Sequence, residues 1–189
     1  MRLAIMAALS LAAAGAALAE PVTGRQAERM LFAPLKAEVE ILPADFLSAN
    51  DKKLLRMVVS EQPYYGAVAL SPEEGLASEA TIAAANHHST EAAAKAALAA
   101  CEEKRTGRRS CEIAAYIRPA GWKGRALSLS SDATRGFGAD YGTRGPRALA
   151  ISPATGRWGL GQGGAAQQEA LRACASTGGA RDCAIVVAD

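Results

Sequence analysis

The sequence predicts an α+β fold: two ββαβ repeats that form a mainly antiparallel sheet with helices on one face, preceded by a helical N-terminal segment. Three observations lead to this prediction. A short motif occurs twice, as GAVALSPEEG at residues 66–75 and as RALAISPATG at residues 147–156. An alanine-rich stretch follows each copy, and two cysteines follow each alanine-rich stretch. Similarity over a whole supersecondary unit indicates two copies of one folded element.

Residues 1–19 have the pattern of a signal peptide. Arg2 supplies a positive start, an uninterrupted apolar run follows, and the triplet ALA at 17–19 matches a cleavage site of the A-x-A type. The apolar run is short for a membrane span of about 20 residues. We therefore expect a mature chain that begins at Glu20, has no transmembrane segment, and is periplasmic or secreted.

The mature chain is expected to be a single domain, residues 20–189. Its expected parts are a helical N-terminal segment, a first repeat, a connector and a second repeat, at residues 20–62, 63–117, 118–146 and 147–189. In the N-terminal segment, GRQAERMLF and SANDKKLLRMVVSEQ are predicted helices, and Ser48 is the expected N-cap of the second. This second helix carries an apolar stripe of Leu54, Leu55, Val58 and Val59. In the connector, RALSLS is a candidate edge strand.

Each repeat is expected to begin with a hairpin. In AVALS and ALAIS, bulky apolar residues alternate with Ala and Ser, so one strand face is bulky and the other is small. Pro72 with Gly75, and Pro153 with Gly156, suit a four-residue turn, because proline presets φ and glycine accepts a positive φ. LASEATI and RWGLGQ are the expected returning strands.

A helix and a third strand complete each repeat. STEAAAKAALAAC and AAQQEALRAC are helices by propensity, and Ser89 is the expected N-cap of the first. CEIAAYI and CAIVVAD are the third strands. Small side chains on both the strand and the helix allow close packing. The two repeats are therefore expected to pair into one sheet of about six strands with the helices on one face.

The four cysteines are expected to form two local disulfides. An exported chain with an even number of cysteines most often contains disulfides, and four cysteines permit three pairings. Because CEEKRTGRRSC and CASTGGARDC are equivalent segments of the two repeats, we predict the bonds Cys101–Cys111 and Cys174–Cys183. The spacing within each pair does not match a C-x₂₋₄-C metal site.

The first cysteine loop (residues 101–111) is the candidate contact surface. It holds Lys104, Arg105, Arg108 and Arg109, whereas the second cysteine loop (residues 174–183) has one Arg and one Asp. The fold therefore does not require the positive charge, which suits an anionic surface such as lipid headgroups or cell-wall polymer. A protease-inhibitor-like loop and a simple solvated loop are the alternatives.

The remaining chemically suggestive residues are interpreted structurally. His87 and His88 are expected in a surface loop, within a segment that makes the first repeat eight residues longer than the second. Ser71 and Ser152 are expected to cap their own turns. The run GLGQGG lacks the continuation of a phosphate-binding loop and is expected to allow close packing.

No catalytic residue is predicted. The carboxylates considered, Glu79, Asp132 and Asp140, have no spacing that indicates an acid–base pair. Trp122 and Trp158 are expected to be buried anchors of a core made of small side chains. Neither a metal nor an organic cofactor is expected.

The pattern A-x-A-x-S-P-x-x-G, then A-x-x-x-A-L-x-A-C, then C-x-I resembles an uncharacterised family of secreted bacterial domains. Members of this family are alanine-rich, cysteine-paired and of unknown function. The second copy, residues 147–187, matches best, and the resemblance covers about half of the mature chain. The shared motifs are structural, so the resemblance implies no catalytic residue.

These observations suggest an exported, non-catalytic binding or structural module of the cell envelope. Its partner would be an anionic envelope surface or another exported protein. The net charge of +2 gives no reason to expect nucleic-acid binding. The alternatives are a small envelope hydrolase with carboxylates that we cannot pair, or an inhibitor-like module that uses the first cysteine loop.

Overall fold

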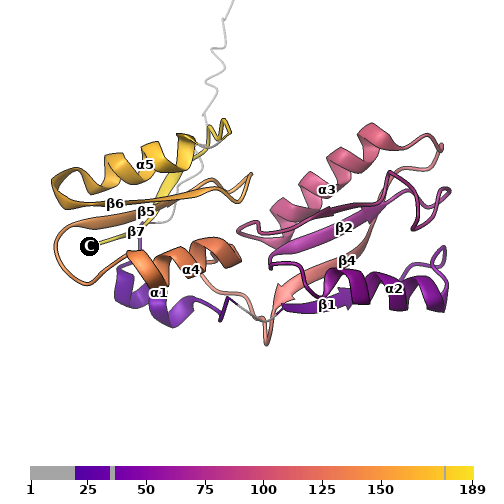
Figure 1. Ribbon diagram of the computed structural model, residues 1–189, viewed down its shortest axis with the longest axis horizontal. Coiled ribbons are helices and arrows are strands. Elements are labelled where there is room, and N and C mark those ends of the chain that lie inside the picture. The colour runs from indigo at the N-terminus through magenta and orange to yellow at the C-terminus, as the bar shows by residue number, and fades with distance from the viewer. Residues whose placement is uncertain (1–19, 35–36, 177) are drawn as a thin grey trace, which may run out of the picture.

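The computed structural model describes residues 20–34, 37–176 and 178–189, so the expected signal peptide lies outside the described residues. The fold is α+β, with two separate antiparallel sheets side by side (Figure 1). The sheet of the first unit contains β1 (Ala37–Ile41), β2 (Gly66–Leu70), β3 (Ile82–Ala84) and β4 (Glu112–Pro119), in the order β1-β4-β2-β3. The sheet of the second unit contains β5 (Arg147–Ile151), β6 (Trp158–Gln162) and β7 (Ala184–Ala188), in the order β6-β5-β7.

Helices cover both faces of each sheet. In the first unit they are α2 (Ala49–Val59) and α3 (Thr90–Lys104), and in the second unit α1 (Gly24–Met30), α4 (Ser131–Asp140) and α5 (Ala166–Ser176). A 3₁₀ turn, Gly163–Ala165, leads into α5. The expectation of one sheet with helices on one face is therefore wrong. Both faces of β2 and of β5 are apolar, so each face requires its own helical cover.

The two faces of the central strands pack differently. On the small face, Ala67 and Ala69 of β2 contact Ala93 and Ala97 of α3, and all four are fully buried. On the bulky face, Val68 and Leu70 pack with residues of α2. The second unit repeats this division, with the alanines of β5 against α5 and Leu149 and Ile151 of β5 against α1 and α4.

Glycines on β6 let α5 come very close to the sheet. A Cβ atom on Gly159 would lie 2.4 Å from the backbone nitrogen of Cys174, and one on Gly161 would lie 1.9 Å from the carbonyl oxygen of Ala166. No side chain fits in these spaces. The run GLGQGG therefore serves helix–sheet packing, as expected.

The two units share several local features. In each, the central strand lies between the returning strand and the third strand, and the register with the third strand shifts once, between Val68 and Ala69 or between Leu149 and Ala150. Each hairpin turn closes on a glycine, Gly75 or Gly156, with φ of 76° and 75°. Superposition of residues 66–117 on residues 147–187 remains a prediction.

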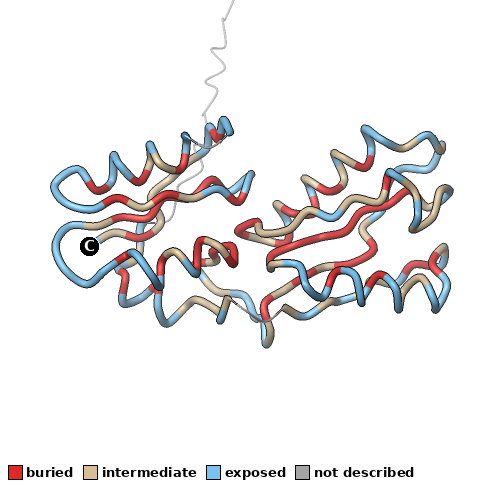
Figure 2. The backbone as a smooth tube through the Cα atoms, viewed as in Figure 1, coloured by how far each residue is buried: buried red, intermediate tan, exposed pale blue. Residues whose placement is uncertain are grey.

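The N-terminal helices form as expected, with capping boxes at Thr23 and Ser48. Ser89 caps α3 by accepting a hydrogen bond from the Ala92 backbone nitrogen at 3.1 Å. In the apolar stripe of α2, however, only Leu55 and Val59 are buried, whereas Leu54 and Val58 are exposed. Figure 2 shows this exposed outer side of α2 in pale blue.

Three elements differ from the expectation. RALSLS at residues 125–130 forms no strand, and the connector instead contains α4. Most of LASEATI lies in turns, so β3 begins only at Ile82. Strand β1 was not predicted, and it pairs with β4 along its whole length.

Candidate functional site

The first cysteine loop lies at the end of the first unit that points away from the second. It joins the end of α3 to the start of β4, and the disulfide Cys101–Cys111 closes it with a Cα–Cα distance of 6.1 Å. The disulfide Cys174–Cys183 closes the second cysteine loop with the same Cα–Cα distance. Both pairs are those expected from the repeat.

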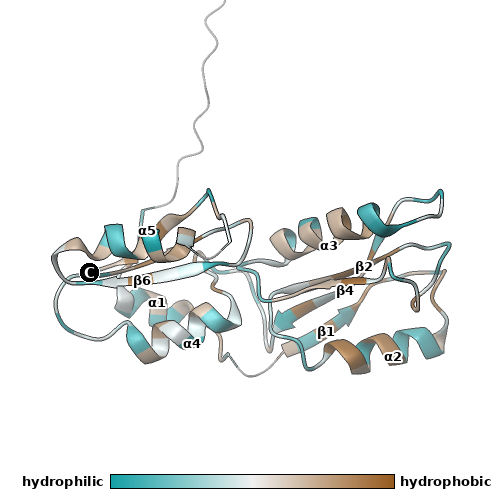
Figure 3. Cartoon of the chain, turned by 45° about the horizontal axis from the view of Figure 1, so that its top comes forward, coloured by the Kyte–Doolittle hydropathy of each residue, from teal (hydrophilic) through white to brown (hydrophobic). Residues whose placement is uncertain are grey.

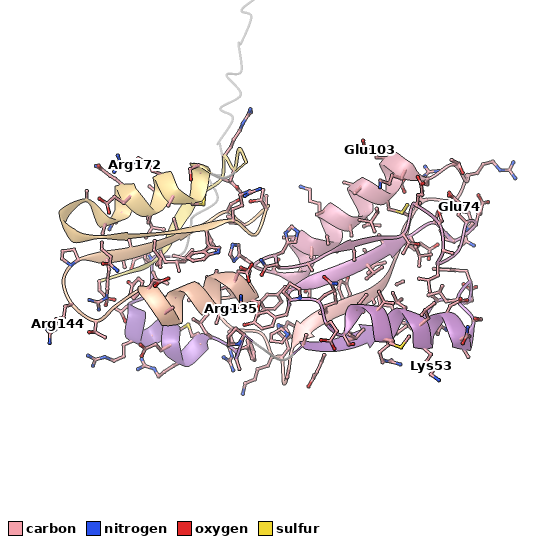
Figure 4. The ribbon with its side chains drawn as sticks, in the orientation of Figure 1. Lys53, Glu74, Glu103, Arg135, Arg144 and Arg172 are labelled. Carbon is pink, nitrogen blue, oxygen red and sulfur yellow. A yellow bond between two sulfur atoms is a disulfide. The ribbon has the colours of Figure 1, made fainter. Side chains whose placement is uncertain are left out.

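Two carboxylates of the first turn (residues 71–75) fix the backbone of this loop. Glu74 accepts hydrogen bonds from the backbone nitrogens of Thr106 and Gly107, both at 2.9 Å. Glu73 accepts from those of Arg108 and Arg109, at 2.5 and 3.2 Å. The two backbone amides lower the pKa of Glu74 to about 2. Figure 4 shows Glu74 at this end of the molecule.

The four predicted contact residues have different surroundings. Arg105 pairs with Glu102 and also donates to the Gly107 carbonyl oxygen at 2.6 Å. Arg109 pairs with Glu112 at 2.9 Å. Lys104 and Arg108 are exposed, and within the described residues neither forms an ion pair.

Carboxylates partly offset the charge of the loop. Five of them lie in or beside it: Glu73, Glu74, Glu102, Glu103 and Glu112. Glu102 and Glu103 belong to the loop sequence CEEKRTGRRSC, whereas the other three lie outside it and were not part of the prediction. The available signal was the first turn, which reads SPEEG where the second reads SPATG.

In the second unit, the carboxylate that joins the turn to the cysteine loop comes from the loop and not from the turn. Here Asp182 of the loop accepts a hydrogen bond from the backbone nitrogen of Ala154 at 2.8 Å and another from the Ser152 hydroxyl. The side chains of Ser152 and Ser71 are fully buried. The side chain of Ser152 thus bonds to the cysteine loop, and the Ser71 hydroxyl has no partner among the described residues. The expectation that both serines cap their own turns holds only in part. The Ser152 hydroxyl oxygen accepts a hydrogen bond from the Thr155 hydroxyl of its own turn at 2.7 Å, whereas in both turns the backbone bonds go to the serine carbonyl oxygen.

The histidine pair is not in a solvated loop, which corrects the expectation. His87 and His88 are only 9% and 3% exposed. The backbone nitrogen of Ser130 donates to His88 Nδ1 at 3.0 Å, and His88 Nε2 lies 3.0 Å from the carbonyl oxygen of Arg157. Because Nδ1 accepts, the ring proton is on Nε2 and donates to Arg157. Burial lowers the pKa of His88 to about 4.

The segment around these histidines forms the contact between the units. Asn86 donates to Asp132 at 2.7 Å and accepts from the Asp132 backbone nitrogen at 3.1 Å. A Cβ atom on Gly156 would lie 2.4 Å from the Asn86 carbonyl oxygen. Asn86, His87 and His88, which belong to the longer segment of the first repeat, thus lie where it meets the second.

The structure does not bring the carboxylates considered together into an acid–base pair. Asp132 pairs with Arg135 at 3.1 Å, beside a cavity of about 270 Å³ that both residues line. Glu79 and Asp140 are exposed, and neither of them lines this cavity. Figure 4 shows Arg135 at the middle of the molecule, between the two units.

The two tryptophans differ in exposure. Trp158 packs against the core of the second unit, where its ring covers Gly136. Trp122 is 41% exposed, and the Arg118 guanidinium carbon lies 4.6 Å from its ring centroid. The expectation of a buried anchor is therefore wrong for Trp122.

Among the described residues, no group of three or more His, Cys, Asp or Glu side chains is placed to bind a metal ion. The same residues include no helix that is both long and apolar enough for a membrane span. In comparisons with known proteins, no family model, no curated protein and no solved structure matches the chain.

Proposed function

We propose that the protein is an exported, non-catalytic binding module of the cell envelope whose first cysteine loop contacts an anionic surface. The observation that carries the proposal is the combination of a fixed backbone with free cations. A disulfide and four backbone hydrogen bonds to Glu73 and Glu74 hold the loop. Lys104 and Arg108 meanwhile project without ion-pair partners within the described chain.

Such a loop loses little conformational freedom on binding, because its backbone is already ordered. Its exposed cations provide the attraction to negative charge, which weakens as salt concentration rises. The second cysteine loop has a disulfide and a carboxylate link of its own without a comparable set of cations. The charge is therefore a property of one copy and not of the scaffold.

The alternative functions have less support. An inhibitor-like loop would need to offer its backbone to a protease, but four of its backbone N–H groups already donate to the first turn. A hydrolase needs two titratable groups that converge in a cleft. Asp132, which lines the cavity between the units, faces Arg135 and Asn86 instead.

The export part of the proposal is tested by N-terminal sequencing of the protein recovered from its own cell. The arrangement of Arg2, the apolar run and the ALA triplet predicts a sequence that begins at Glu20. The two disulfides support an oxidising compartment. A cytoplasmic pool that begins at Met1 would contradict export.

The contact surface is tested with the double variant Lys104→Gln/Arg108→Gln. Retention is measured on purified cell wall and on vesicles of phosphatidylcholine with phosphatidylglycerol, at low and high salt. Each cation near an anionic membrane surface contributes about 1 kcal/mol, so retention should fall about tenfold or more. Thermal stability should change by less than about 0.5 kcal/mol.

The matched control is Arg172→Gln/Arg181→Gln, which removes two exposed cations from the second unit. This variant should bind like the parent protein. If the parent is retained by neither probe at low salt, or if both double variants lose the same amount of binding, the first cysteine loop is not the contact surface.

A further inference from the structure

Helix α2 presents an unusual amount of apolar surface to solvent. The large hydrophobic side chains that are exposed in the described residues are Leu54, Met57, Val58 and Trp122, at 43%, 64%, 59% and 41%. The first three lie at spacings of three and four residues, so they share one face of α2. Figure 3 shows this helix on the outside of the first unit, with brown hydrophobic residues along it.

The helix cannot turn this face inward. Leu55 and Val59, on its other side, are 3% and 2% exposed and pack against Val68 and Ile117 in the core. The capping box between Ser48 and Asp51 also fixes the first turn. The exposed apolar face is therefore a stable feature of the folded protein and not a result of local fraying.

The same helix is positively charged. Lys52, Lys53 and Arg56 lie within α2, whose one carboxylate is that of Asp51. That carboxylate is occupied by the backbone nitrogen and the hydroxyl of Ser48. Figure 4 shows Lys53 pointing away from the body of the protein. Exposed apolar side chains flanked by cations are typical of helices that lie in the interface of an anionic bilayer.

We propose that α2 binds the surface of an anionic lipid bilayer, with Leu54, Met57 and Val58 in the interfacial layer and Lys53 and Arg56 at the headgroups. This inference rests on the proposed function, because it specifies that the anionic surface is a lipid bilayer. A hydrated polysaccharide offers no apolar layer in which three apolar side chains gain free energy, whereas a bilayer does. Each buried apolar group and each cation adds to the binding.

The first cysteine loop lies at the same end of the first unit as the start of α2 (Figure 1). The guanidinium carbon of Arg109 is 5.9 Å from the centroid of the Phe46 ring, and Phe46 lies two residues before the N-cap Ser48. The loop cations and the helix can therefore act on one negatively charged surface. The two contacts remain separable by mutation, because they use different side chains.

The test is flotation with vesicles of phosphatidylcholine alone or with phosphatidylglycerol. The protein begins at Glu20, so that it contains every described residue but not the apolar run of residues 1–19, which would bind bilayers by itself. The parent should float with the anionic vesicles at low salt. Leu54→Gln/Met57→Gln/Val58→Gln should lower this partition about tenfold or more, and Lys52→Gln/Lys53→Gln/Arg56→Gln should also lower it about tenfold or more, with the remaining binding due to the loop cations.

The control is Trp122→Gln, which removes a similarly exposed apolar side chain elsewhere in the first unit and should float like the parent. The inference is overturned if the triple apolar variant keeps the parent partition. It is also overturned if that variant instead abolishes concentration-dependent dimerisation of a parent that does not float, since the face is then an interface between copies. If Lys104→Gln/Arg108→Gln loses flotation while neither α2 variant does, the proposed function stands and the role of α2 is contradicted.

Discussion

His88 is buried at the contact between the two units with both ring nitrogens in hydrogen bonds. A second ring proton, on Nδ1, would face the N–H group of Ser130. Charged groups near the ring are few: His87 disfavours its protonation and Asp182 favours it, and burial is the largest cause of the low pKa. The neutral ring is thus part of the contact itself.

The stability of the protein should therefore fall in mild acid. The pKa of His88 is about 4 when folded and 6.5 in the unfolded reference. Between these values the unfolded chain binds a proton that the folded chain does not, so stability falls as pH falls from 6.5 towards 4, by about 3 kcal/mol. The pKa of His87 is lowered in the same direction by burial.

Urea denaturation at pH 7, 6 and 5 measures this loss, and His88→Gln is the comparison. The variant should be less stable at pH 7 by about 1–3 kcal/mol, because buried partners lose their hydrogen bonds. Its stability should depend less on pH in this range. Equal pH dependence in the parent and the variant would show that His88 is not buried in the neutral form.

Gly161 should not tolerate even the smallest side chain. A Cβ atom there would lie 1.9 Å from the Ala166 carbonyl oxygen, which is backbone and cannot rotate away. Gly161→Ala should therefore destabilise the protein by about 1–3 kcal/mol in urea denaturation. Gly138→Ala is the control, because Gly138 lies in exposed helix with no atom near its missing Cβ, and it should stabilise by about 0.5–1 kcal/mol. A destabilised control with a neutral Gly161→Ala would contradict the packing of α5.

At the scale of elements, each cysteine loop is held to its hairpin turn by carboxylates, from the turn in the first unit and from the loop in the second. Glu74→Gln should therefore speed amide exchange at Thr106 and Gly107 without affecting the second turn. Asp182→Asn should speed exchange at Ala154 and leave the first loop unchanged. Hydrogen exchange followed by peptide mass spectrometry measures both. Faster exchange in both loops of each variant would mean that the two units are not independent in this respect.

The sequence was sufficient for the elements whose signals are local. The helices capped by Ser48 and Ser89 and both disulfides are all present. Helix α4 was missed because its two glycines lower its propensity, and burial of Ala133 and Phe137 stabilises it instead. Leu127 and Leu129 alternate like a strand and are both buried against the second sheet, but their segment pairs with no strand of either sheet. Alternating apolar residues therefore indicate that a segment is buried, but they do not show that it pairs with another strand.

The candidate site was predicted less completely for a related reason. The four cations of the loop were visible in the sequence, but Glu73 and Glu74 lie about thirty residues earlier, and only the fold brings them to the loop. The burial of His88 likewise depends on the second unit, with which it makes contact across a long stretch of chain. Neither periodicity nor spacing reports such long-range contacts.

At the scale of the whole molecule, the first described residues of the chain belong to the second unit. Val22 pairs with Val187 of β7, and α1 packs in the core of the second unit before the chain crosses to β1 (Figure 1). The chain then returns through the connector to α4. The second unit is therefore built from both ends of the described chain. The chain crosses between the two units twice, which ties them together more tightly than the single crossing between consecutive repeats would.

The proposed function requires that the first cysteine loop is a contact surface on a scaffold that does not need the charge of the loop. The most direct measurement transfers the second turn and loop, SPATG and CASTGGARDC, into the first unit in place of SPEEG and CEEKRTGRRSC. Both must be exchanged, because the carboxylate that joins them changes sides. We expect a folded protein with two disulfides whose flotation with phosphatidylglycerol vesicles falls about tenfold or more. Flotation equal to that of the parent, in a folded and fully oxidised protein, would contradict it.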